Sequence, residues 1–78
     1  MARYLVFAYN HTTYEQWLHD KGLTERDAKY ITQEHQLLGC HYPDWEAVFL
    51  SGWAENFTYR YPIIERIWQT LRANGHTL

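Results

Sequence analysis

Apolar residues gather in runs along the chain, and polar segments with helical spacing separate these runs. The first run, Arg3 to Tyr9, is rich in strand-favouring residues and has no polar alternation, which is typical of a strand covered on both faces. The run from Trp45 to Trp53 is the most apolar, and it predicts a strand that is central in the sheet or lies beside the first strand. A shorter run at Lys29 to Thr32, which lies between these two runs in the chain, predicts a short second strand.

The segments that follow these runs have the spacing of helices. A helix is expected over Thr13 to Lys21, with a capping box that begins at Thr12 or Thr13 and with Gly22 as its stop. A brief helix from Gln33 to Leu38 follows the second strand. A longer helix is expected from Pro62 to Gly75, where the apolar positions that repeat at helical spacing are Ile63, Ile64, Ile67, Trp68 and Leu71.

The order strand, helix, strand, helix, strand, helix predicts a single α/β domain over residues 1–78. Because each connection carries a helix, we expect a three-stranded parallel sheet. Right-handed crossovers would make it a half-Rossmann-like arrangement. Strand order 2-1-3 is preferred, with 3-2-1 as the alternative.

Composition narrows the class of partner. The chain has 78 residues and a formal net charge of −2, and its charges are interspersed, so a duplex nucleic acid is not expected as a partner. The single cysteine, Cys40, cannot form an internal disulfide, which fits a reducing cytosol. The apolar stretch Tyr4 to Tyr9 is too short for a membrane span. We therefore expect a cytoplasmic protein that does not bind membranes.

Parallel sheets bind ligands beyond the carboxyl ends of their strands, at the point where neighbouring connections diverge to opposite faces. For order 2-1-3 this point lies between the first and third strands. The sequence places polar and small residues on both sides of the expected crevice: Asn10, His11, Thr12 and Thr13, with Ser51, Gly52, Glu55 and Asn56. These residues, or the free amides at the start of the first helix, would suit a small ligand such as a nucleotide. The competing interpretation is that they cap a helix and form a turn.

Catalytic and metal-binding patterns are weak in this sequence. His35, Cys40 and His41 are close together, but they lack the spacing that orients ligands on one ion, so no metal and no cofactor are expected. His11 and Glu55 would be the acid and base groups of a hydrolase or transferase, yet nothing in their spacing makes them converge. We expect a protein that is not an enzyme.

Aromatic residues make up 18% of the chain and are dense between Tyr42 and Tyr61. An extended segment would place Phe57, Tyr59 and Tyr61 on one side. With Trp53 and Arg60 they form a candidate partner-binding surface, because Tyr and Trp often anchor interfaces. Self-association through this surface, stacking of a nucleic-acid base by Tyr59 to Tyr61, and packing of the rings against the last helix all stay open.

Four stretches, "RYLVFAYN", "WLHDKGLTERDAKYIT", "QLLG" and "VFLSGW", carry a resemblance that covers Arg3 to Trp53. The chain resembles small uncharacterised α/β proteins encoded by tailed bacteriophages of actinobacteria. The most specific residues of the resemblance are Gly22, Leu23, Arg26, Asp27, Ala28, Tyr30 and Ile31. The connection from Trp53 to Pro62 is longer than that group would lead one to expect.

The resemblance implies a phage origin and action in the host cytoplasm, and it supplies no mechanism. With the aromatic excess, it leads to the expectation of an oligomeric, non-enzymatic accessory protein that binds a bacterial host protein in host takeover or anti-defence. The alternative is a small-ligand binder that uses the crevice.

Overall fold

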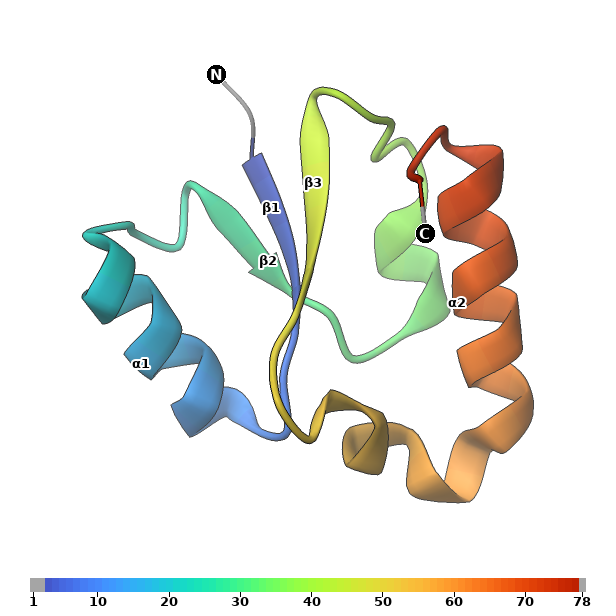
Figure 1. Cartoon of the computed structure of the whole chain (residues 1–78), viewed down its shortest axis with the longest axis horizontal. Coiled ribbons are helices and arrows are strands. Elements are labelled where there is room, and N and C mark those ends of the chain that lie inside the picture. The colour runs from blue at the N-terminus through green and yellow to red at the C-terminus, as the bar shows by residue number, and fades with distance from the viewer. Residues whose placement is uncertain (1–2, 78) are drawn as a thin grey trace.

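The structure, a computed structural model, describes residues 3–77 except for the side chains of residues 58–61. Three strands, β1 (Arg3–Phe7), β2 (Ala28–Tyr30) and β3 (Trp45–Phe49), form the sheet. The α-helices are α1 (His11–Lys21) and α2 (Tyr61–Ala73), and the 3-10 helices are η1 (Glu34–Leu37) and η2 (Trp53–Arg60). Figure 1 shows the sheet between α1 on one side and α2 on the other.

The sheet is parallel and its strand order is β2-β1-β3, so the preferred order 2-1-3 is confirmed. Strand β1 pairs with β2 through Tyr4 to Val6 and with β3 through all five of its residues. The apolar run of β3 therefore lies beside the first strand, but it occupies an edge of the sheet.

Two apolar clusters cover the two faces of β1. Leu5 and Phe7 pack with the α2 side, in a cluster that includes Ile67 and Leu71 of that helix. Val6 and Ala8 pack on the other face with residues of α1. The side chains from Leu5 to Ala8 are 0% exposed, as the continuous apolar run predicts for a strand covered on both faces.

Several element boundaries differ from those expected. The first helix begins at His11 because Asn10 is its N-cap and accepts hydrogen bonds from the Thr13 amide at 2.8 Å and the Thr13 hydroxyl at 2.9 Å. The capping box proposed at Thr12 or Thr13 is therefore wrong. Strand β3 ends at Phe49, since a turn with Gly52 at φ 78° follows it.

The η2 segment, Trp53–Arg60, consists of two 3-10 turns joined by a kink at Phe57, and Tyr61 begins α2, so the expected extended conformation of residues 57–61 is wrong. Within it Phe57 is 1% exposed and belongs to the core cluster on the α2 side. The η2 segment therefore connects β3 to α2, and Phe57 anchors it in the core.

Candidate functional site

The main-chain groups of the sheet divide into those that face β1 and those that face outward. In a parallel ladder, alternate residues of a strand direct both N–H and C=O to the same neighbour. The amide of Arg3 donates to the Asp44 carbonyl and the amide of Leu50 donates to the Phe7 carbonyl, both at 2.9 Å. Residues Glu46 and Val48 therefore face β1, and the main-chain groups of Ala47 and Phe49 face outward.

The outward carbonyls of β2 are covered by side chains, whereas its outward amides have no hydrogen-bond partner among the described residues. The amide of Tyr4 donates to the Asp27 carbonyl, so by the same alternation Ala28 and Tyr30 face outward. Their carbonyls accept hydrogen bonds from the Tyr14 hydroxyl at 3.2 Å and from Gln36 Nε2 at 3.3 Å. This edge is also only three residues long and carries a lysine, two features that discourage strand pairing.

The outer edge of β3 has no such cover among the described residues. It is five residues long, and its outward amide at Trp45 is bonded to the His41 carbonyl at 3.0 Å. No hydrogen bond to a described residue engages the outward groups of Ala47 or Phe49. All four apolar residues of β3 are partly exposed. An apolar strand of this length with a free edge is a template for pairing with another strand.

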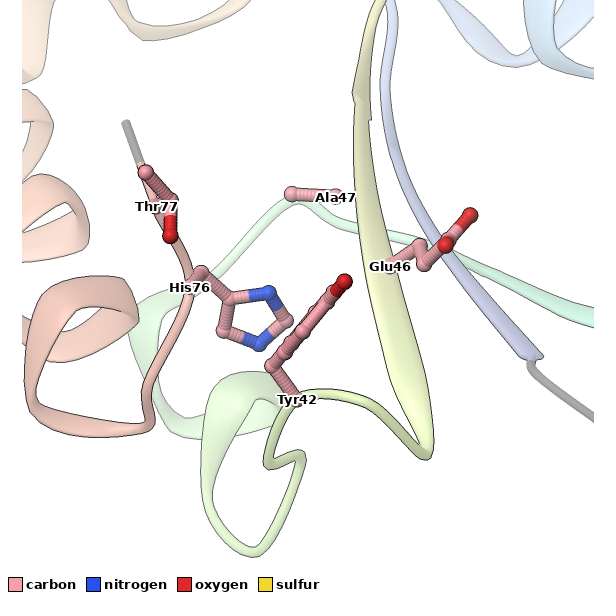
Figure 2. Close-up of a pocket in the computed structure, with 5 residues that line it drawn as sticks. All are labelled: Tyr42, Glu46, Ala47, His76 and Thr77. Carbon is pink, nitrogen blue, oxygen red and sulfur yellow. The ribbon is translucent and has the colours of Figure 1, made fainter.

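A pocket of about 230 Å³ lies beside this edge and is lined by Tyr42, Glu46, Ala47, His76 and Thr77. Figure 2 shows the Ala47 side chain directed toward the pocket and that of Glu46 directed to the other side of β3. The His76 ring lies between β3 and the segment that follows α2. The Tyr42 ring meets the His76 ring edge-on at 6.0 Å and is half exposed. The pocket therefore opens next to the free groups of Ala47.

The end of α2 holds His76 in place. The His76 amide donates to the Leu71 carbonyl and the Gly75 amide donates to the Arg72 carbonyl, which is the Schellman pattern. Gly75 has φ 88°, a conformation that favours glycine. Asn74 Nδ2 then ties this turn to the last residue of η1, through the Leu37 carbonyl at 3.0 Å.

The His76 ring is 5% exposed, and its Nε2 lies 2.9 Å from the Cys40 carbonyl oxygen. A carbonyl only accepts, so Nε2 carries the proton in this contact. The other nitrogen, Nδ1, has no hydrogen-bond partner among the described residues. In the neutral ring Nδ1 is therefore an acceptor that is free to bind a donor.

The two loops of the expected crevice do meet at the carboxyl end of the sheet. A Cβ on Gly52 would lie 3.6 Å from the Tyr9 Cβ, and Asn56 Nδ2 donates to the Ala8 carbonyl at 3.2 Å. Asn56 also donates to the Tyr30 hydroxyl at 2.9 Å, which joins η2 to β2. Because Asn56 bridges these elements and Asn10 caps α1, both amides already hold the fold together.

The other crevice residues lie on exposed surface. His11 is paired with Glu15 one helical turn away and its ring contacts Tyr14 and Tyr30. Ser51 and Glu55 are exposed. Burial, with the carboxylates of Glu25 and Glu15, raises the pKa of Tyr14 above its ordinary value.

A separate hollow of about 420 Å³ lies between α1 and the end of β3. Its lining residues are Thr12, Thr13, Gln16, Trp17, Asp20 and Leu50. Only Thr12 and Thr13 were expected in a ligand site. Trp17 and Leu50 give the hollow an apolar surface, and Gln16 donates to Asp20 at 3.0 Å on its polar side.

The expected aromatic surface is divided by the structure. Phe57 is buried, so its ring is not part of any exposed surface. Trp53 is partly buried and contacts Phe7, Phe49, Phe57 and Trp68 at centroid distances of 4.9 to 6.2 Å. The side chains of Tyr59, Arg60 and Tyr61 lie outside the described part of the structure.

Among the described residues, no group of three or more His, Cys, Asp or Glu side chains is placed to hold a metal ion. No described helix is long and apolar enough to span a membrane. Searches against protein-family models, curated proteins and solved structures found no match.

Sequence reasoning missed Tyr42, Ala47 and His76. Tyr42 and Ala47 stand within segments that were interpreted as loop and strand, and nothing in their own sequence marks a free edge. His76 follows directly after the helix-stop glycine Gly75, so a Schellman turn that directs it back to the domain was the one available indication.

Proposed function

We propose that this protein is a non-enzymatic binding protein that captures an extended segment of a partner protein as a fourth strand on β3. The carrying observation is the free edge of β3, where the outward main-chain groups of Ala47 and Phe49 have no partner among the described residues. Strand addition supplies those groups with hydrogen bonds, and side-chain pockets beside the edge supply specificity.

The packing of Phe49, at the end of β3, also supports this proposal. Phe49 stacks on Phe7 at 4.6 Å and on Trp68 at 5.0 Å, so the inner face of the strand is firmly packed. A rigid edge of this kind binds without first having to be ordered, which lowers the entropic cost of association.

The resemblance to phage proteins extends the proposal to a bacterial host protein as the partner, with the host cytoplasm as the place of action. This proposal places the binding surface on β3 and not on the segment Trp53 to Tyr61, which the sequence suggested. Trp53 would then support the surface indirectly, because its ring packs against that of Phe49 at 4.9 Å.

Selection from a displayed library of random linear nonapeptides tests this proposal. The full chain should enrich peptides with strand-forming sequences. Ala47→Pro removes the outward N–H while leaving the ladder to β1 intact, so it should abolish enrichment with little change in thermal melting.

Ala47→Ser is the matched control, because it keeps both the N–H and a small side chain. It should retain the peptides that the natural chain selects. Enrichment that survives Ala47→Pro, or a natural chain that enriches nothing, would contradict strand addition at this edge.

A second candidate function is a small-ligand binder that uses the hollow between α1 and β3. The favouring observation is its volume of about 420 Å³, which lies within the range of small-molecule sites. Trp17 and Leu50, which line the hollow, would contact a flat apolar ring of the ligand. This proposal includes the half-Rossmann interpretation of the chain, in which nucleotides bind at such a position.

Thermal melting with a panel of nucleotides separates the two candidates. A ligand at a hundred times its dissociation constant stabilises by about 2.7 kcal/mol, which is a shift on the order of 10 °C for a domain of this size. Gln16→Glu should remove that shift, since it adds a negative charge of nearly the same size to the lining of the hollow, where it would repel an anionic nucleotide. An unchanged melt across the panel would exclude the nucleotide interpretation.

A further inference from the structure

We infer that the pocket beside Ala47 accepts one side chain of the bound strand, and that this side chain donates a hydrogen bond to His76 Nδ1. The inference rests on the strand addition proposed above and names the chemistry that would select the partner. The donor classes that fit are hydroxyl, amide and ammonium groups.

Position is the first argument. Ala47 supplies both the free main-chain groups of the edge and part of the pocket lining. A strand paired to β3 directs alternate side chains to the same face as Ala47. One of those side chains would therefore point toward the space of about 230 Å³ that Ala47 helps to line.

The buried imidazole is the second argument. His76 is 5% exposed, and the contact of Nε2 with the Cys40 carbonyl sets the neutral tautomer with the lone pair on Nδ1. No buried nitrogen or oxygen of the described side chains lacks a hydrogen-bond partner, so the unpartnered Nδ1 is the side of the ring that solvent, or a bound donor, can reach. An acceptor held this rigidly favours a neutral or cationic donor over a carboxylate, which would place two acceptors together.

A second copy of this chain fits the pocket less well than a foreign peptide. In a two-fold pair of β3 strands, the side chains on the pocket face come from Trp45, Ala47 and Phe49 of the other copy. Of these only Trp45 has a donor, and its ring is held beside Arg3 at 4.6 Å and Lys29 at 4.9 Å.

The same nonapeptide library tests the inference at higher resolution. After alignment of the selected peptides, one position should prefer Ser, Thr, Asn, Gln or Lys. His76→Lys keeps an N–H donor for the Cys40 carbonyl and has no acceptor atom, so the preference should disappear and chosen peptides should bind about tenfold more weakly. Replacing the preferred peptide residue with Ala should cost the natural chain the same factor and His76→Lys nothing further.

Nitrogen NMR of the ring provides a measurement that does not depend on a variant. The free protein should show the Nε2–H tautomer, and the Nδ1 resonance should move when a selected peptide is added. An Nδ1–H tautomer, a preference for Asp or Glu, or selected peptides that lack any preferred position would overturn the inference and leave strand addition standing.

Two outcomes would contradict the proposed strand addition or its peptide partner, as well as the role of the pocket. If the natural chain selects no peptide, strand addition fails and the inference fails with it. If sedimentation shows a dimer that Ala47→Pro converts to a monomer, the edge is occupied by a second copy and the peptide partner is wrong.

Discussion

The two edges of this sheet are built from the same parallel ladder, yet their outward carbonyls differ in hydrogen bonding. At β2, the outward carbonyls of Ala28 and Tyr30 accept hydrogen bonds from Tyr14 and Gln36. At β3, the corresponding groups of Ala47 and Phe49 have no hydrogen-bond partner in the described part of the chain. Two side chains thus cover the outward carbonyls of the short strand β2, while those of the longer strand β3 have no partner among the described residues.

Side chains in a small domain can therefore cover the carbonyls of one sheet edge and leave those of the other edge open. An unprotected apolar edge favours aggregation, and natural sheets usually cover or charge it. Glu46 gives β3 one charge, but its main-chain groups face β1 and its side chain is exposed. Because the free edge lies beside a pocket, it fits the proposed binding of a partner strand better than it fits incomplete protection.

Proline substitutions at two neighbouring positions of β3 should differ most in their effect on the free energy of unfolding. Val48→Pro removes an N–H that faces β1, so we expect a loss of at least about 3 kcal/mol in the free energy of unfolding. Ala47→Pro removes an outward N–H and should cost about 1 kcal/mol or less. Urea denaturation of both variants measures this contrast, and equal losses would show that Ala47 does not face outward.

Removal of Gln36 should expose the protected edge. Its Oε1 accepts from the amides of Thr32 at 2.7 Å and Gln33 at 2.8 Å, in addition to the bond from Nε2 to β2. Gln36→Leu leaves these groups without partners, and we expect a loss of about 2 kcal/mol. Gln69→Leu, on the exposed surface of α2, is the matched control and should change the urea midpoint little.

Tyr14→Phe should have the smallest effect, a loss of about 1 kcal/mol from the bond to the Ala28 carbonyl. Because the folded-state pKa of Tyr14 is raised, the neutral hydroxyl stabilises the fold fully below the unfolded pKa of 10.0 and less as pH rises through the folded value. The advantage of the natural chain over Tyr14→Phe should therefore shrink above pH 10. Melting curves of both proteins between pH 8 and 11 check this sign.

Much of the architecture follows from the sequence. The apolar run at β1, the spacing of the apolar residues of α2 and the need for crossover helices predict a parallel sheet of order 2-1-3, and the structure has this sheet. Boundaries were less accurate, because Asn10 competes with Thr12 and Thr13 as a cap and because all three residue types suit that role.

The site was harder to anticipate, for a physical reason. Alternation within Phe57 to Tyr61 suggested a strand, but burial of Phe57 in the core favours a 3-10 turn there. The free edge depends on which residues of β3 face β1, and this is set by the pairing register and not by any single residue. His76 joins the site only through the turn at Gly75.

The half-covered state of β3 has a consequence for the lifetime of the protein. A fourth strand would give β3 the position that β1 already has, with neighbours on both sides. Local opening would then require the loss of both neighbours, so the bound protein should resist proteases longer than the free one. Its abundance in a cell would rise and fall with the supply of its partner.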